Sequence, residues 1–210
     1  MNVCFSRFQW IAAAFISLTV AGCIGGQSAP TQFYMLDPAV LAPASPTAVV
    51  GKPAVHIVLD PVEIPQYLNR PQIVTHLDRS EYQLDEFNQW MEPLGDNLTR
   101  VIAENLSEML GADGIDILSM SGPFETDYTV TVQILRMDGK LGQGTVLVAR
   151  WSLFNRSDNS LLLTTRSVFQ ETVSDDTYQG FMQVQNRMIE SLSRAIADGI
   201  KPIVLQRVGS

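Results

Sequence analysis

The sequence predicts an α+β fold: a mostly antiparallel sheet with two amphipathic helices packed on one of its faces. Two stretches, residues 93–110 and about 176–200, place apolar residues three and four positions apart, which is typical of amphipathic helices. Three stretches between residues 127 and 172 alternate apolar and polar residues and are joined by short turns, which indicates an antiparallel meander. Because each helix has a single apolar stripe, we expect both helices to lie on the sheet.

Short strands and a loop are expected before the first helix. Residues 32–36 form a strand candidate, and residues 38–53, rich in Ala, Pro and Ser, indicate an exposed loop. Residues 54–62 are rich in β-branched side chains and predict a second strand. Residues 72–77 and 81–84 predict the two strands of a hairpin.

The first helix is expected over residues 93–110. Pro93 suits the first turn, where the N–H group that proline lacks would have no helical partner. Gly111 is a natural C-terminal stop. The apolar stripe of this helix consists of Leu94, Leu98, Val101, Ile102, Leu106, Met109 and Leu110.

One short strand and then the meander should follow the first helix. The short strand covers residues 115–120, and the meander strands cover residues 127–137, 145–155 and 160–172. The turns between the meander strands are short, so neighbouring strands should run antiparallel.

The second helix closes the predicted fold. Asp176 or Thr177 can cap its N-terminus with a side-chain oxygen, the helix should run to about Ile200, and Pro202 should stop it. Its apolar stripe consists of Phe181, Met182, Met188, Ile189, Leu192, Ile196 and Ile200.

The first 22 residues are predicted to be a secretory signal peptide. Arg7 and the amino terminus supply a positive start, residues 8–20 form an almost uncharged apolar run, and the small residues Ala21 and Gly22 precede Cys23. The apolar run is too short to cross about 30 Å of hydrocarbon comfortably, because that takes roughly 20 apolar residues.

Residues 20–23 (VAGC) resemble the lipobox of bacterial lipoproteins. The resemblance implies a diacylglycerol on the Cys23 thiol, cleavage before Cys23 and an acyl chain on the new amino group. Two or more acyl chains give lasting membrane attachment, whereas a single chain is marginal. The alternatives are an uncleaved signal anchor, or an ordinary cleaved signal with a chance cysteine. We expect a lipidated Cys23 with a flexible tether, residues 23–31, and one domain over residues 32–210.

Charge and cysteine content exclude several classes of function. The formal net charge of −8 argues against a nucleic-acid partner, because nucleic acids bind to basic protein surfaces. Cys4 would leave with the signal peptide and Cys23 would be lipidated, so neither is available as a catalytic nucleophile or metal ligand. Ile24 stands where an aspartate would signal inner-membrane retention, which favours the outer membrane.

Three segments carry a family resemblance: residues 33–36 (FYML), 65–74 (PQYLNRPQIV) and 90–94 (WMEPL). In this order they resemble the ABC-type transport auxiliary lipoprotein family, which paraquat-inducible protein C typifies. The resemblance covers essentially the whole mature chain. The family more often has an acidic residue where this chain has Asn69.

The resemblance implies a lipid-anchored, periplasm-facing outer-membrane protein without enzyme activity and without a cofactor. The partner that it implies is a mammalian-cell-entry-domain protein of an inner-membrane ABC system, which bridges the periplasm and moves lipids between membranes. Such a partner would form a ring or tube, which favours a homo-oligomer of this chain. An alternative hypothesis is a lipid-binding carrier with its own apolar cavity between sheet and helices.

A contact surface for this partner is predicted around residues 67–71. Tyr67, Leu68 and Arg70 combine aromatic, apolar and cationic side chains in a proline-stiffened loop, which is the composition of a binding hot spot. Trp90 is a further candidate for the same role. The alternative is that Tyr67 and Leu68 belong to the core, that Arg70 pairs with an acid, and that Trp90 covers a sheet edge.

Nothing in the sequence indicates a metal or catalytic centre. His56 and His76 lack the spacing of zinc ligands and are expected to be ordinary histidines. The acidic residues of the predicted hairpin lack the glycine-containing loop of an EF-hand and are expected to form a solvated face; they are Asp78, Glu81, Asp85 and Glu86. No nucleophile elbow or P-loop is present, so a periplasmic hydrolase is the least favoured hypothesis.

Overall fold

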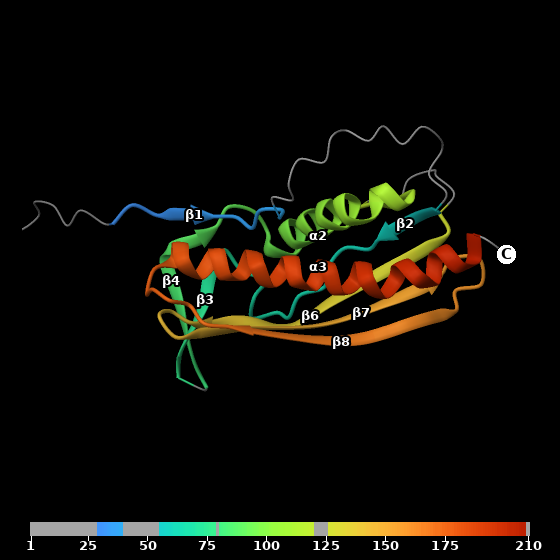
Figure 1. Ribbon diagram of the computed structural model, residues 1–210. Coiled ribbons are helices and arrows are strands. Elements are labelled where there is room, and N and C mark those ends of the chain that lie inside the picture. The colour runs from blue at the N-terminus through green and yellow to red at the C-terminus, as the bar shows by residue number, and fades with distance from the viewer. Residues whose placement is uncertain (1–28, 40–54, 79, 120–125, 209–210) are drawn as a thin grey trace, which may run out of the picture. The chain divides into compact units, whose positions relative to one another are not determined.

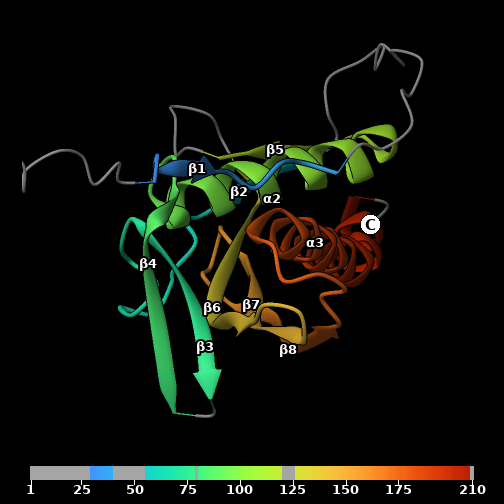
Figure 2. The same ribbon diagram turned by 90° about the vertical axis from the view of Figure 1, so that its left-hand side faces the viewer.

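Strands and two long helices form the part of the chain that the computed structural model describes, residues 29–39, 55–78, 80–119 and 126–208 (Figure 1). The strands form two sheets. The smaller sheet has the order β1-β4-β3, with bounds Gln32–Tyr34, Glu81–Trp90 and Gln72–Asp78. In Figure 2, β3 and β4 project together away from the helices.

The larger sheet has five strands in the order β5-β2-β6-β7-β8. In this order the strands cover Ile115–Leu118, Val55–Leu59, Tyr128–Lys140, Gly144–Asn155 and Leu161–Glu171. Strand β2 is parallel to both β5 and β6, whereas β6, β7 and β8 form the predicted antiparallel meander.

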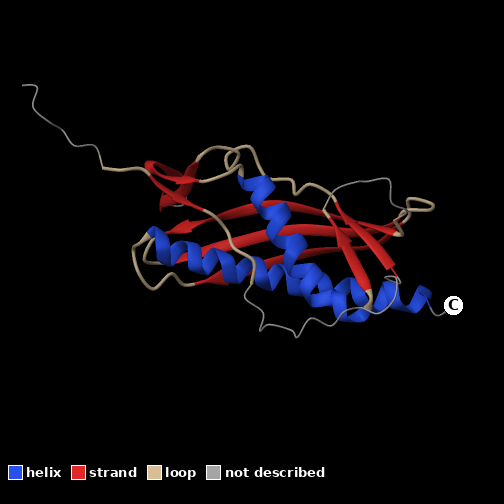
Figure 3. Cartoon of the chain, turned by 90° about the horizontal axis from the view of Figure 1, so that it is seen from above, coloured by secondary structure: helices blue, strands red, loops and turns tan. Residues whose placement is uncertain are grey.

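Both helices lie on one face of the larger sheet (Figures 2 and 3). They are α2 (Leu94–Leu110) and α3 (Tyr178–Val208). Gly199 brings α3 close to the sheet, because a Cβ atom there would stand 2.5 Å from the Trp151 ring. These observations confirm the predicted α+β fold.

The core lies between the helices and the sheet. On β7 the helix-facing residues Leu147, Ala149, Trp151 and Leu153 are 0–2% exposed. The predicted stripe of α3 is equally buried, and that of α2 is buried except for the partly buried Met109. Burying one such side chain contributes about 1.5–3 kcal/mol, so these two helix faces hold the helices to the sheet.

The predicted start of the second helix is confirmed. Thr177 precedes the first turn of α3, and its Oγ1 accepts a hydrogen bond of 3.0 Å from the Gly180 N–H group. Hydrogen bonds from the side chain and the backbone N–H of Thr177 lower the pKa of Asp175, so this exposed carboxylate supports the cap.

The predicted end of that helix is wrong, because α3 continues through Pro202 to Val208. Pro202 is exposed, so water can satisfy the Asp198 carbonyl group, which loses its helical partner. Val204, four residues beyond Ile200, is fully buried and extends the apolar stripe. Its burial offsets the missing hydrogen bond.

The predicted end of the first helix is confirmed, because α2 ends at Leu110 and Gly111 follows it. A 3₁₀ turn, Gly111–Asp113, continues from α2, and the left-handed residue is Gly114, with φ of 74°. One further expectation differs from the structure. The strands form two sheets instead of one, since β1 and the β3–β4 hairpin pair only with each other.

All these elements belong to one compact unit, Thr31–Ser210. Among the described residues, neither helix has a stretch that is both long and apolar enough to cross a bilayer.

Candidate functional site

The three segments that carry the family resemblance meet in space. Strand β1 pairs in parallel with the end of β4, where Tyr34 stands opposite Trp90. The Met91 N–H group donates a hydrogen bond of 2.8 Å to the Tyr34 carbonyl, and the Trp90 N–H group donates one of 2.7 Å to the Pro71 carbonyl. We call this region, residues 33–36, 65–74 and 90–94, the three-segment junction.

A buried amide fixes the junction to the first turn of α2. Asn97 Oδ1 accepts a hydrogen bond of 2.8 Å from the Leu36 N–H group, and Asn97 Nδ2 donates one of 3.1 Å to the Leu36 carbonyl. Leu36 and Leu94 are 0% and 2% exposed. The junction is therefore a rigid part of the domain, which suits a preorganised contact surface.

A small pocket of about 290 Å³ opens at the junction. Its lining consists of Asn69, Arg70, Pro71, Trp90, Met91, Glu92 and Pro93. Met91 is 63% exposed, and nearby β1 leaves Phe33 53% exposed. Exposed apolar side chains around a pocket with Trp and Arg have the composition of a protein-binding surface.

The structure separates the four predicted contact residues into two pairs. Arg70 and Trp90 line the same pocket, where Trp90 is 8% exposed and belongs to the core. Tyr67 instead donates a hydrogen bond of 2.6 Å to Asp138 Oδ2, and Leu68, 2% exposed, lies in the core. Burial and the contact with Asp138 raise the pKa of the Tyr67 hydroxyl. The partner role of these residues stays a prediction.

The predicted lipidation site, Cys23, lies outside the described residues.

The acidic residues of the β3–β4 hairpin differ from one another in exposure. Asp85 is partly buried, whereas Glu81 and Glu86 are exposed.

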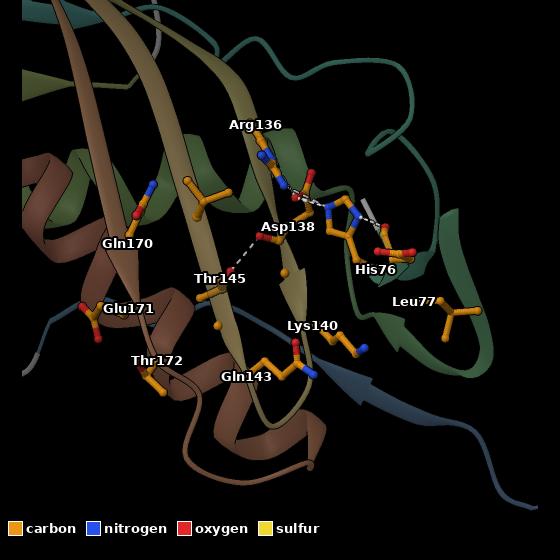
Figure 4. A pocket seen from close by; sticks show the side chains of 14 residues that line it. His76, Leu77, Arg136, Asp138, Lys140, Gln143, Thr145, Gln170, Glu171 and Thr172 are labelled. Atoms are coloured by element: carbon orange, nitrogen blue, oxygen red, sulfur yellow. Dashed lines mark hydrogen bonds and ion pairs between the residues drawn. The ribbon is translucent and has the colours of Figure 1, made fainter. Parts of the chain in front are cut away.

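A second, more polar groove of about 930 Å³ lies between the end of β3, the β6–β7 turn and the end of β8 (Figure 4). Its lining residues include His76 and Asp138, whose side chains point toward each other in Figure 4. Asp138 is fully buried, and His76 is 9% exposed.

A hydrogen-bonded network surrounds the Asp138 carboxylate. Arg136 Nε donates a hydrogen bond of 2.8 Å to Oδ1, His76 Nε2 contacts the same oxygen, and Tyr67 donates to Oδ2. Burial alone would lower the pKa of Arg136, but the hydrogen bond to Asp138, the charge of Asp138 and the neighbouring Tyr82 and Tyr67 together raise that pKa. Both oxygens of the buried carboxylate have partners, as a stable buried charge requires.

The network ties three separate elements together. Tyr67 belongs to the loop before β3, His76 to β3, and Arg136 and Asp138 to β6. Arg136 and Asp138 were not predicted as important from the sequence. The sequence did contain a signal for Asp138. An aspartate at the end of a strand with alternating apolar residues is expected either to be exposed to solvent or to pair with another side chain.

No metal centre is found among the described residues, since no group of three or more potential ligands is close enough together. His56 Nδ1 lies 3.3 Å from Asp116 Oδ2 across the β2–β5 pair, and both side chains are partly exposed. This contact between the two surface side chains does not require a bound metal ion.

Comparisons with solved structures support the fold. A crystal structure of an uncharacterized protein shares 20% identity and covers 82% of this chain and 99% of that chain, with a TM-score of 0.69. The crystal structure of protein XCC0632 from Xanthomonas campestris shares 12% identity and covers 86% of this chain and 100% of that chain, with a TM-score of 0.66. No curated protein matches the sequence.

A family model decides the classification. The model described as the ABC-type transport auxiliary lipoprotein component matches residues 34–197, which is well over half of the chain. The match contains the segments at 65–74 and 90–94 and nearly all of the first segment. The family description connects its members to ABC transport systems. This chain therefore belongs to the ABC-type transport auxiliary lipoprotein family.

Proposed function

We propose that this protein is a non-enzymatic accessory of an ABC-type intermembrane lipid transport system. Lipid on Cys23 anchors it to the periplasmic side of the outer membrane, and the three-segment junction docks on a periplasm-spanning mammalian-cell-entry-domain protein. The observation that carries this proposal is the meeting of the three family segments at one surface. Leu36 of the first segment is also fixed to Asn97 of α2, 61 positions away along the chain, by direct hydrogen bonds.

The exposed side chains of the junction support a docking role. Phe33, Met35 and Met91 are 53%, 40% and 63% exposed, although each is large and apolar. Burying such side chains against a partner contributes favourable free energy in proportion to the apolar area covered.

The geometry of the polar groove favours a structural role over catalysis. A catalytic His–Asp pair needs a nucleophile or substrate proton at the free histidine nitrogen. Here His76 Nδ1 lies 3.3 Å from the Asp78 carbonyl oxygen, and Nε2 faces Asp138 and Arg136. The nearby Thr145 hydroxyl donates to the Asp138 carbonyl and accepts from Gln185, so it is also engaged.

Large apolar side chains of the helices and of the sheet are buried between these two layers. Residues from both layers that meet there, such as Leu153, Ile189 and Ile196, are fully buried. The pockets described above are instead lined by loops and strand ends. This packing favours an accessory protein over a lipid carrier.

Affinity purification of the tagged full-length protein at native level tests the proposal. After detergent extraction, mass spectrometry should find the mammalian-cell-entry-domain protein with the wild type. We expect Met91→Asp to reduce its recovery strongly, because an exposed apolar contact becomes charged. The matched control, Leu161→Asp, replaces a leucine that is 53% exposed on β8 and should leave recovery unchanged. Two results would reject the proposed docking surface: purification of the wild type without this partner, or an equal loss of the partner from Met91→Asp and Leu161→Asp.

A further inference from the structure

One donor of the Arg70 guanidinium, the Nε atom, is unsatisfied within the described residues. This atom is buried and has no hydrogen-bond partner. No ion pair with an acidic residue is found for Arg70 in the described part of the chain. A buried, charged donor without an acceptor is unfavourable, and a bound acceptor relieves that cost.

Among the described residues of the lining, none accepts a hydrogen bond from Arg70 Nε. Glu92 also lines the pocket, but its carboxylate lies 3.1 Å from the Arg100 guanidinium, which holds it. The rest of the lining is Asn69 and the apolar or aromatic side chains Pro71, Trp90, Met91 and Pro93. An apolar lining strengthens a hydrogen bond from a charged donor, because little water competes with it.

We infer that this pocket binds one carboxylate group, the side chain of an Asp or Glu residue of the partner protein. Arg70 Nε donates to that carboxylate, and an apolar neighbour of the acidic residue packs on Trp90 and Met91. This inference rests on the proposed docking function and names the chemistry that the docking surface recognises.

The size and charge of the pocket favour a protein carboxylate over a lipid phosphate. A volume of about 290 Å³ is at the low end of ligand pockets and suits a side chain. Arg70 is the one cation among the described residues of the lining, and the Glu92 carboxylate is already paired with Arg100. A phosphate group is bound by several donors as a rule, whereas a single guanidinium can hold a carboxylate.

Binding of the purified periplasmic part of the mammalian-cell-entry-domain protein from the same organism tests the inference. The full-length lipoprotein in detergent is compared with Arg70→Met and with Arg166→Met. Arg166 is a suitable control, because it is exposed on β8 and forms no ion pair within the described residues. We expect Arg70→Met to weaken binding by at least about 30-fold, as for the loss of one partner of a buried charge pair. Arg166→Met should bind like the wild type.

Two additional measurements separate recognition from a structural role. The melting temperature of Arg70→Met should equal or exceed that of the wild type, because methionine removes a buried donor that has no acceptor. Arg70→Glu should abolish binding, and replacing one acidic residue of the partner by arginine should restore it.

Each outcome has a distinct meaning. Equal binding of Arg70→Met and the wild type overturns the carboxylate site and leaves the docking function intact. A strong fall in the melting temperature of Arg70→Met overturns it as well, since Arg70 would then stabilise the fold. Release of the wild type from the partner by vesicles of phosphatidylglycerol, with no effect of phosphatidylcholine vesicles, would assign the pocket to a lipid phosphate. Absence of wild-type binding rejects the docking function, and this inference falls with it.

Discussion

At the scale of single residues, Asp138 connects the two sheets. Its carboxylate is fully buried and accepts hydrogen bonds from Tyr67 and Arg136, at 2.6 and 2.8 Å. Its contact with His76 joins β6 to β3, although these strands belong to different sheets. The aromatic ring of Tyr82 packs on His76, with a centroid distance of 4.4 Å. This one carboxylate therefore positions the projecting hairpin.

Removing the carboxylate should destabilise the domain. We expect Asp138→Ala to lower the free energy of unfolding by about 3 kcal/mol, because the buried His76 and the partly buried Tyr67 hydroxyl would lose their hydrogen-bond partner. Urea denaturation followed by circular dichroism measures this change. The control Asp198→Ala removes an exposed aspartate from α3 and should stay within about 0.5 kcal/mol. An equally small effect of Asp138→Ala would show that the network does not stabilise the fold.

A partly buried tyrosine predicts how stability depends on alkaline pH. Burial and the neighbouring Asp85 raise the pKa of Tyr178 to about 12 from its usual 10.0. Below pH 10, Tyr178 is therefore protonated in both the folded and the unfolded protein. In this pH range its full contribution to the free energy of unfolding is present. As the pH rises from 10 to 12, the unfolded state loses its proton first, so this contribution is lost.

Denaturation between pH 8 and 12 tests this dependence. Tyr178→Phe should lose less stability above pH 10 than the wild type, because phenylalanine has no proton to lose. The exposed Tyr82 supplies the control variant Tyr82→Phe, which should follow the wild-type profile. A Tyr178→Phe profile that coincides with the wild type would show that Tyr178 does not govern the alkaline loss.

Only part of the candidate site could be predicted from single residues. Arg70 and Trp90 were selected by residue type, and the structure brings them to one pocket. Asp138 was missed, because its importance depends on Tyr67 and His76, which lie 71 and 62 positions away in the sequence. Side-chain partners at such separations leave no periodic pattern.

At the scale of elements, periodicity predicted the strands and helices but not how the strands group. The alternation of β6 and β7 and the stripes of both helices are confirmed by burial. The separation into two sheets was not predicted, because the parallel pairing of β2 with β5 and β6 joins segments far apart in the sequence. Strand β4 also runs to Trp90, beyond its expected end, since it gains β1 as a second partner.

The continuation of α3 past Pro202 leads to a prediction for that element. Pro202→Ala should raise the free energy of unfolding by about 1–3 kcal/mol, because alanine supplies the N–H group that the Asp198 carbonyl lacks. Thermal and urea denaturation measure the gain. Gln206→Ala, at an exposed position of the same helix, should change little. A loss of stability in Pro202→Ala would mean that the proline conformation itself is needed.

At the scale of the whole domain, the packing of the elements creates the proposed docking surface. The α2 helix places Asn97 against Leu36, and the end of β4 places Trp90 beside Pro71. The three segments predicted the family, and the match over residues 34–197 confirms it. That these segments form one surface could not be predicted, because it depends on the register between β1 and β4.

The central claim is that the three-segment junction contacts the mammalian-cell-entry-domain partner in the cell. Photo-crosslinking tests it most directly, with p-benzoylphenylalanine placed at position 91 or, as control, at position 161, both of which are exposed. After irradiation of intact cells, mass spectrometry should identify an adduct with the partner from position 91 and none from position 161. An adduct with the partner from position 161 alone, or from neither position in cells that contain the partner, would contradict the account.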